Sequence, residues 1–354
     1  MSQIASSELK HRFDFRLVSS PQLSSYDPRT LWQLQRAMRR HKPDLIHISG
    51  LQSEGLCAAL AARTCRRAKV LLSIHGSTKD FFFVSRLRRN AVHLMLEPLT
   101  LWLSDAAYSV CRHRQEQRTI KWFSRRNLGV LHNAVEVLPP ESADPAVRAF
   151  LNPEHNDVVA LCVGRLSAEK GLLVLAGALD ILVAKGLSVP RVVVVGDGPQ
   201  RAEVEHAFLR HIEAGRACFL GKRSDVRKLL LASDLFVLPS LYENLSMAIL
   251  EAMEAGLPVL GTRAGGNPEL VVENETGLLV PPNDEASLAS ALSALTCSKT
   301  LRARLGRAGR QRVVECFAPQ DFERRLEAMY STLLSEGTKA ESHLPRKAMA
   351  NAAT

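Results

Sequence analysis

PSLYENLSMAILEAMEAGLPVLGTRAGGNPELVVENETGLLVPP, residues 239–282, is the segment from which the rest of the sequence is most easily interpreted. A loop after an apolar strand leads into a helix, and another apolar strand follows, which is the pattern of a parallel α/β sheet. Glu243 falls in the loop and Glu251 on the helix. At ~1.5 Å per helical residue, the two carboxylates lie no more than roughly 12 Å apart along the axis.

The start of this predicted helix lies between the two carboxylates. There Leu245, Ser246 and Met247 offer backbone N–H groups and a partial positive charge, which together bind anions. An anion site with a carboxylate on either side matches a ligand with hydroxyls at both ends and a diphosphate between them. Nucleotide sugars have this shape.

Two cations follow another predicted strand in VGRLSAEKG, residues 163–171. Arg165 can bind phosphate oxygens in a bidentate fork and Lys170 as a mobile point charge, so both would stabilise a departing nucleoside diphosphate. The sequence contains no Asp-x-Asp. We therefore expect no metal held by paired aspartates, and no other cofactor.

Strands and helices alternate along the whole chain, and the alternation breaks once. Residues 134–157 contain four prolines, as a linker between domains would. We therefore expect two Rossmann-like α/β domains facing a cleft. Their predicted bounds are a first, acceptor-side domain over 1–139, a linker over 140–157, a second, nucleotide-sugar-binding domain over 158–318, a last helix over 319–334 and a disordered tail over 335–354.

Composition excludes several classes of protein. Of the 354 residues, 46% are hydrophobic and 23% charged, which is typical of a globular chain. No apolar run approaches the ~18–20 residues of a membrane span, and the start lacks the pattern of a secretory signal. The seven cysteines are scattered, unlike a disulfide framework or zinc site. We expect a cytoplasmic protein.

The basic charge is concentrated in the first half of the chain. Residues 1–150 hold 23 Lys and Arg against 12 Asp and Glu, whereas residues 151–354 hold 23 against 24. Aromatic residues make up only 5%, so the basic charge does not indicate a nucleic-acid-binding surface. An anionic substrate or membrane face fits better, and a plain solvated surface fits as well.

The motifs resemble those of the retaining glycosyltransferases of family 4, also called glycosyltransferase group 1, which have the GT-B fold. The family is marked by E-x7-E, here Glu243 and Glu251, and by V-G-R-x4-K-G, here residues 163–171. The last helix resembles the segment that crosses back to the first domain. Further stretches match in the same order: VVGDGP (194–199), FLG (219–221), ASDLFVLPS (232–240), EAMEAGLPVL (251–260) and TGLLVPP (276–282).

The resemblance implies a role for each matching position. Glu243 would contact the transferred sugar, and Glu251 would hold the ribose hydroxyls. Asn244, Leu245 and Ser246 stand where the family often has Gly-Phe-Gly. Their backbone amides remain available, but the identity of the donor sugar is left open. The other implied donor-binding positions are Gly164, Arg165, Lys170 and Gly196, with Lys222 and Arg223 beside the base. The side chains of Asn244 and Glu269 are interpreted as capping or solvated groups, and Gly265 and Gly266 as a turn.

In the first domain, His75 follows a predicted strand, at the edge where open α/β sheets bind ligands. Because the family has a histidine facing the donor sugar in this context, the resemblance makes His75 a catalytic candidate that could donate a hydrogen bond. His132 is expected to pack. No glycine precedes Gly50, so the family's first strand, glycine-rich loop and helix have no counterpart, and we expect the first domain to lack its first βα unit.

The predicted helix over 86–102 opens with three arginines and continues with an apolar stretch. With the basic charge of the first half, this predicts docking on an anionic membrane surface, at its inner face, or on an anionic lipid-linked acceptor. The apolar positions Val92, Met95, Leu96, Leu99 and Leu103 fall broadly on one side, and packing of that side on the sheet is the alternative.

The leading hypothesis is a hexosyltransferase. It would move a hexose from a nucleotide-diphosphate sugar to a carbohydrate or lipid-linked acceptor with retention, in cell-surface polysaccharide or glycolipid synthesis. Because the first domain is expected to be short, an inactive or regulatory protein that binds the donor is the alternative. A sugar-nucleotide epimerase of the same architecture would not normally carry this E-x7-E set.

Overall fold

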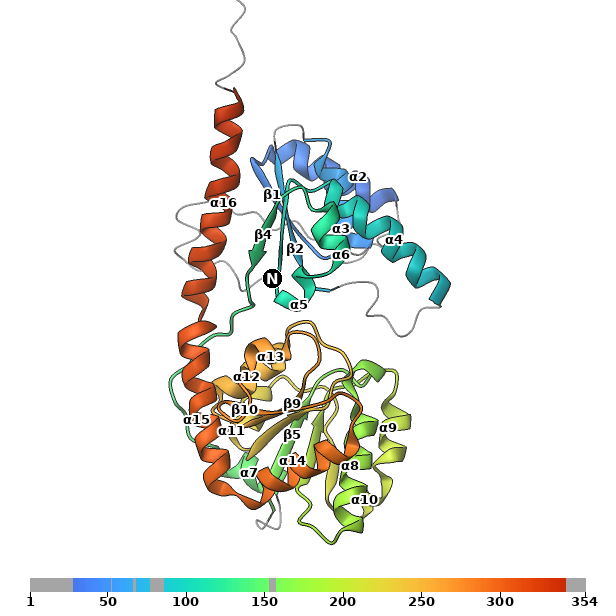
Figure 1. The fold of residues 1–354 in the computed structure, drawn as a ribbon, viewed down its shortest axis with the longest axis vertical. Coiled ribbons are helices and arrows are strands. Elements are labelled where there is room, and N and C mark those ends of the chain that lie inside the picture. Colours follow the sequence, from blue (N-terminus) through green and yellow to red (C-terminus); the bar gives the residue numbers. More distant parts are fainter. Residues whose placement is uncertain (1–27, 52, 66–67, 77–85, 153–156, 342–354) are drawn as a thin grey trace, which may run out of the picture.

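The computed structural model describes residues 28–341, except 52, 66–67, 77–85 and 153–156. Within these residues the chain forms two α/β domains, one above the other in Figure 1. Each domain is built on a parallel sheet, of four strands in the first and six in the second. The prediction of two Rossmann-like domains is confirmed.

The first domain has its strands in the order β1-β2-β3-β4, all parallel. Residues 112–123 form two short helices, because Gln117 between them has extended backbone angles. The expected lack of a first βα unit concerns residues outside the described part of the chain. The elements are α2 (Pro28–His41), β1 (Leu45–Ser49), α3 (Ser53–Ala62), β2 (Lys69–Ile74), α4 (Arg86–Trp102), β3 (Ala106–Ser109), α5 (Arg112–Gln115), α6 (Arg118–Phe123) and β4 (Asn127–Val130).

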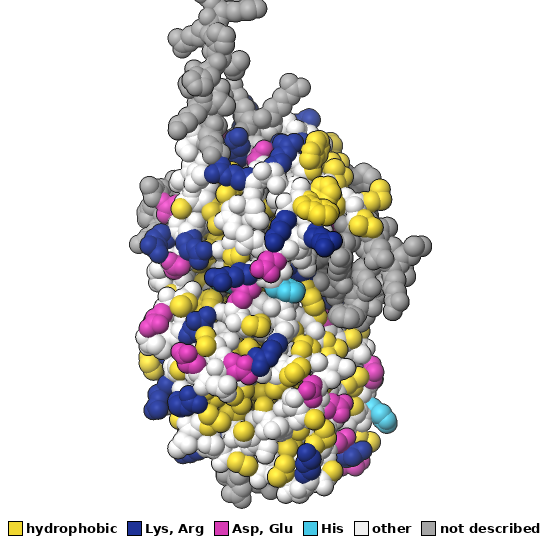
Figure 2. Space-filling model, viewed as in Figure 1, with side chains coloured by type: hydrophobic (Ala, Val, Ile, Leu, Met, Phe, Trp, Pro, Cys, Tyr) yellow, Lys and Arg dark blue, Asp and Glu magenta, His cyan; other side chains and the backbone are white. Residues whose placement is uncertain are grey.

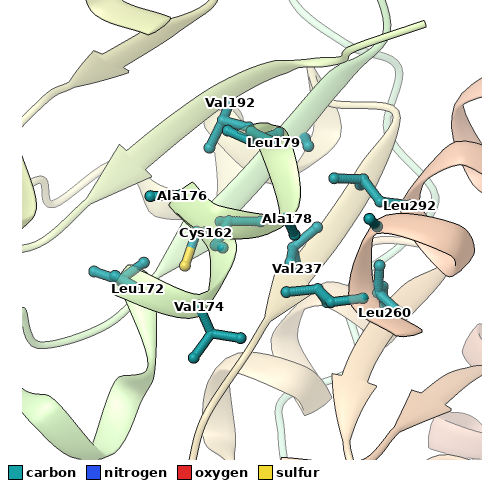
Figure 3. Close-up of a cluster of buried hydrophobic side chains, with 14 of the residues drawn as sticks. Cys162, Leu172, Val174, Ala176, Ala178, Leu179, Val192, Val237, Leu260 and Leu292 are labelled. Atoms are coloured by element: carbon teal, nitrogen blue, oxygen red, sulfur yellow. The ribbon is translucent and has the colours of Figure 1, made fainter. Parts of the chain in front are cut away.

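The second domain has its strands in the order β10-β9-β8-β5-β6-β7. Continuous apolar runs such as VALCV form its central strands, because helices cover both faces. Figure 3 shows one of these cores, where Leu172 and Leu179 of α8 meet Val237 and Leu260 of the sheet. The strands are β5 (Val159–Val163), β6 (Arg191–Val195), β7 (Ala217–Phe219), β8 (Leu235–Leu238), β9 (Val259–Thr262) and β10 (Gly277–Val280). The helices are α8 (Leu172–Ala184), α9 (Arg201–Ala207), α10 (Leu209–Glu213), α11 (Val226–Leu231), α12 (Met247–Glu254), α13 (Asn267–Leu270), α14 (Glu285–Cys297) and α15 (Lys299–Cys316).

Part of the predicted linker is an ordered helix, α7 (Pro145–Leu151). The side chain of Asp144 caps it by accepting a hydrogen bond from the Ala146 N–H at 2.9 Å. Leu151 is fully buried in the core of the second domain. The linker prediction is therefore wrong over α7, since this helix packs as part of the second domain.

The last helix, α16 (Pro319–Glu341), leaves the second domain and runs along the first (Figure 1). Its Leu326, Tyr330 and Leu333 form one core with Leu71 and Tyr108 of the first sheet. The helix continues past residue 334, so the predicted disordered tail is wrong over 335–341, because extending a helix that has already formed is far easier than starting one. None of the described helices is both long and apolar enough for a membrane span.

Candidate active site

Glu243 lies in the loop between β8 and α12 and is almost wholly buried, with 7% of its surface exposed. Its Oε1 accepts hydrogen bonds from the Ser240 hydroxyl at 2.9 Å and from the Lys170 ammonium at 2.5 Å. Lys170 ends a single 3-10 turn, Ala168–Lys170, in the loop after β5. The structure thus brings together two predicted site residues from the carboxyl ends of adjacent strands.

Glycines hold these loops close to one another. Gly265 has φ +53°, and a Cβ built on it would lie 1.6 Å from the carbonyl oxygen of Glu243, so only glycine fits there. Gly196, with φ +136°, approaches the carbonyl oxygen of Gly164 in the same way, at 1.8 Å from a built Cβ. The predicted turn at Gly265 therefore also packs directly against the backbone of the loop that carries Glu243.

The residues that follow Glu243 form the start of α12. Ser246 is the N-cap, and its hydroxyl accepts from the Ile249 N–H at 3.3 Å, while Leu245 is buried in the core. The Asn244 side chain is already engaged, since its Oδ1 accepts from Arg114 Nε at 2.6 Å. Only the backbone N–H groups of this segment, at the positive end of the helix, are suited to a phosphate.

Glu251 lies on α12 and is partly buried. Burial raises its pKa above the ordinary value. Among the described residues its carboxylate has no hydrogen-bond or ion-pair partner. A carboxylate that has lost water without gaining a protein donor is a strong acceptor for ligand hydroxyls.

The cations predicted to bind the donor differ in their surroundings. Arg165 is exposed, and no carboxylate of the described residues lies within ion-pair distance of it. Arg223 instead grips its neighbour Asp225 through Nε at 2.9 Å and a terminal nitrogen at 2.7 Å, so its guanidinium is already engaged. Lys222 lies beside it and is exposed. Their loop is held by the Gly221 carbonyl oxygen, which accepts a hydrogen bond from the Gly196 N–H at 2.8 Å.

His75 follows β2 in the first domain, and its Nε2 lies 3.2 Å from the Ser73 hydroxyl. Burial lowers the pKa of His75, so the ring is neutral near pH 7. Because the Ser73 hydroxyl donates to the Ile48 carbonyl at 3.1 Å, it accepts from His75 Nε2–H. In this arrangement the Nδ1 of His75 is an acceptor, and the expected role of His75 toward the donor sugar stays a prediction.

No motif in the sequence indicated that a buried arginine crosses between the domains. Arg114 of α5 is fully buried, and its guanidinium lies over the Tyr242 ring, 5.2 Å from the centroid, as well as bonding Asn244. The first domain thereby holds both residues that flank Glu243. Sequence motifs could not reveal this contact, because the partners are 130 residues apart.

A second contact between the domains is made by Glu269 of α13. Its carboxylate accepts from the Arg112 N–H at 2.8 Å and the His113 N–H at 3.2 Å, which begin α5, and from His132 Nε2 at 2.8 Å. Burial alone would raise the pKa of Glu269, but these hydrogen bonds hold it below the usual value. The interpretation of Glu269 as an ordinary cap is therefore incomplete, because it caps a helix of the other domain. His132 likewise does more than pack.

The described residues contain no group of three or more His, Cys, Asp or Glu side chains arranged to hold a metal ion. Charge on a bound diphosphate would be met by Lys170, Arg165 and the N–H groups of α12. The expectation of a metal-free site stays a prediction.

Comparison with known families agrees with this geometry. The family described as Glycosyl transferases group 1 matches residues 144–312, and the one described as Glycosyltransferase Family 4 matches residues 4–137. The chain belongs to the group 1 glycosyltransferases. Among curated relatives, it is 29% identical to the UDP-Gal:alpha-D-GlcNAc-diphosphoundecaprenol alpha-1,3-galactosyltransferase of Escherichia coli, over 78% of this chain and 72% of the relative.

Solved structures share the GT-B fold. Sucrose-phosphate synthase from Thermosynechococcus elongatus superposes with a TM-score of 0.74 and 23% identity, over 87% of this chain and 78% of that one. HepE of Anabaena, in complex with UDP and glucose, gives a TM-score of 0.72 and 21% identity, over 89% and 84%. These likenesses show the fold, with its two Rossmann-like domains, whereas the family match and the curated relatives identify a nucleotide-sugar glycosyltransferase.

Proposed function

We propose that this protein is a retaining, metal-independent hexosyltransferase that uses a nucleoside-diphosphate sugar. Its acceptor would be a carbohydrate or lipid-linked sugar, in the synthesis of a cell-surface polysaccharide or glycolipid. The observation that carries the proposal is the Lys170–Glu243 pair beside the start of α12, with the unpartnered carboxylate of Glu251 on the same helix.

The donor would be bound from both ends. Glu251 accepts the ribose hydroxyls, and Glu243 accepts a hydroxyl of the hexose. Lys170 has three donors and gives one to Glu243, so two remain for the diphosphate. Arg165 and the first N–H groups of α12 supply the other donors. These fixed donors stabilise the charge that develops on the departing diphosphate.

Retention requires the acceptor to arrive on the face from which the diphosphate leaves. Glu243 is anchored by Lys170 and Ser240, so it suits the binding of a sugar hydroxyl better than a moving nucleophile. His75, neutral and with Nδ1 as acceptor, would orient another hydroxyl from the first domain.

Membrane attachment at the inner face would involve an apolar patch of the first domain. The patch consists of exposed side chains of α4 and α6, and Figure 2 shows hydrophobic side chains gathered on the upper domain. Arg125 lies over the Trp102 ring at 5.1 Å, which sets a cation beside the patch. Aromatic rings with basic neighbours are suited to the headgroup region of a bilayer. We define the patch as Leu94, Met95, Leu99, Trp102, Trp122 and Phe123, exposed by 40–73%.

This patch differs from the apolar stripe expected from the sequence. Met95 and Leu99 face solvent as expected for docking, but Leu103 is buried against the sheet. The side chains of Arg86, Arg88 and Arg89 lie outside the part of the structure that is described. The membrane proposal therefore rests on the patch and on Arg125.

The test combines binding and product analysis. A thermal-shift panel of nucleoside diphosphates identifies the base, with Lys170→Ala as the variant expected to lose the shift. A labelled sugar of that nucleotide is then offered with a prenyl-diphosphate-linked sugar, and NMR gives the anomeric configuration of the product. An inverted product would contradict retention. Donor binding without transfer to any acceptor would favour the inactive, regulatory alternative.

A further inference from the structure

A hollow of about 570 Å³ lies on the first domain. None of the residues predicted to bind the donor lines it. Its walls come from α5, α6, β4, the segment after β4, and α16. The residues that matter here are Arg112, Glu116, Lys121, His132 and Arg325.

The hollow carries a surplus of positive charge. Among the described residues, no carboxylate lies within ion-pair distance of the Arg112 or Lys121 side chain. Arg325 is fixed by donating to the Val130 carbonyl at 2.7 Å and has only a long contact to Asp321, at 3.9 Å. Glu116 is the one acidic residue among those that line it.

The nearby acid of the second domain, Glu269, does not line the hollow. Its carboxylate accepts from two backbone N–H groups and from His132, which is one of the lining residues. Arg112, Lys121 and the fixed guanidinium of Arg325 therefore face an open space, and Glu116 is the one acidic residue that lines it with them. The three side chains are exposed, and cations gathered in this way suit phosphate oxygens, which accept bidentate and charge-assisted hydrogen bonds.

The apolar patch adjoins the hollow through α6. Lys121 lines the hollow, and the next two residues, Trp122 and Phe123, belong to the patch, with Trp122 exposed by 73%. An anion that enters the hollow can thus carry an apolar chain onto the patch. We propose that this hollow binds the phosphate or diphosphate group of an amphipathic acceptor, separately from the donor diphosphate.

Assigning the ligand as the acceptor rests on the proposed function, whereas binding of a phosphate group does not. The experiment therefore measures binding. Farnesyl diphosphate and inorganic pyrophosphate are titrated calorimetrically into the full-length protein. The variants are the double substitution Arg112→Gln with Lys121→Gln, the donor-site variant Lys170→Ala, and Arg118→Gln. Arg118 is a matched control, because it lies on the same helix as Lys121, is exposed, and does not line the hollow.

We expect the double variant to bind farnesyl diphosphate about tenfold or more weakly, the scale of one or two lost charge-assisted bonds, while Arg118→Gln changes little. Nucleoside-diphosphate binding should be kept in the double variant and lost in Lys170→Ala. Stronger binding of farnesyl diphosphate than of pyrophosphate supports a lipid source, and equal binding supports a phosphate without a tail.

The proposal is overturned if wild type and double variant bind both probes equally, or if wild type binds neither. Either result would leave donor binding intact, so it could not be mistaken for a failure of the transferase assignment. If the wild type bound no nucleoside diphosphate, that result would contradict the proposed function and not the phosphate site in the hollow.

Discussion

Lys170 and Glu243 lie 73 residues apart in the chain and meet through a contact of 2.5 Å between Nζ and Oε1. The pair joins the loops after two neighbouring strands, β5 and β8. The carboxylate and the ammonium neutralise each other in the free protein, and in the proposed function they also hold the geometry that a sugar diphosphate needs. The pair would then link the stability of the free protein to its ability to bind the donor.

Removing either partner is expected to impair transfer. Glu243→Gln should reduce kcat by at least tenfold with donor affinity nearly kept, because the hexose loses a charged acceptor while the diphosphate contacts remain. Lys170→Met should weaken donor binding and lower the free energy of unfolding by about 1–3 kcal/mol, since it leaves a buried carboxylate unpaired. Steady-state kinetics and denaturant titration measure both. Near-wild-type turnover of Glu243→Gln would remove this residue from the site.

We expect the partly buried carboxylate of Glu251 to lower the free energy of unfolding of the ligand-free protein, as the cost of a site for the ribose. Its folded pKa is raised, so the unfolded state ionises first, and the cost appears as the pH rises through the ordinary value and persists above the raised one. Glu251→Gln is expected to stabilise the free protein by about 0.5–1 kcal/mol at pH 8 and less at pH 5, while losing nucleotide affinity. Thermal melts at both pH values with and without nucleoside diphosphate test this. A destabilised Gln variant would mean that an interaction of the carboxylate had been overlooked.

Glu269→Gln should loosen the contact between the domains. The amide donates as well as accepts and carries no charge, so the bonds from the start of α5 and from His132 weaken. We expect a larger radius of gyration by small-angle scattering and a lower kcat/KM, with nucleotide affinity nearly unchanged. The exposed Glu275→Gln serves as the control for loss of a charge. In the wild type the contact should persist above the lowered pKa of Glu269 and fail as the pH falls through it.

Turnover is expected to survive EDTA. The reason is that, in the proposed function, Lys170, Arg165 and the α12 N–H groups would meet the diphosphate charge themselves. Arg165→Ala should weaken nucleoside-diphosphate binding by about 1–3 kcal/mol without affecting stability, since its side chain is exposed. Activity lost in chelator and restored by Mg²⁺ would show that a metal is required after all.

Acid should weaken the attachment of α16. His47 Nδ1 lies 2.8 Å from the Tyr330 hydroxyl, and burial, with His75 nearby, lowers the pKa of His47 to about 4. Between that value and the ordinary 6.5, the unfolded state binds more protons, so stability falls as the pH drops through this window. As the pH is lowered from 7 to 5, the melting temperature should fall more steeply for the wild type than for His47→Gln. Equal slopes would show that His47 is not the group that lowers stability in acid.

The sequence predicted most of what depends on local pattern. Apolar runs and turn residues predicted the alternation of strands and helices, and the motifs placed Glu243 and Lys170 in loops after strands and Glu251 on the following helix, where the structure has them. Their roles toward the donor stay predictions. What it missed depends on distance along the chain. Arg114 and Glu269 act across the domain boundary, and no periodicity or short motif marks a residue whose partner lies more than a hundred positions away.

Helix α7 and the end of α16 were missed for a different reason. Proline and small polar residues suggested a linker and a tail, but one buried side chain, Leu151, draws α7 onto the second domain. Tertiary packing outweighed local preference there. The apolar patch was predicted only in part, because the helical stripe does not reveal which of its faces the sheet will cover.

The path of α16 has a consequence for how the polypeptide is made. On the ribosome, the strands that carry Leu71 and Tyr108 emerge long before Leu326, Tyr330 and Leu333, which cover them. The second domain is contiguous in sequence and can complete its core first. One flank of the first sheet stays bare until α16 has been made, so the nascent chain must keep an unfinished apolar surface from aggregating while the second domain is translated.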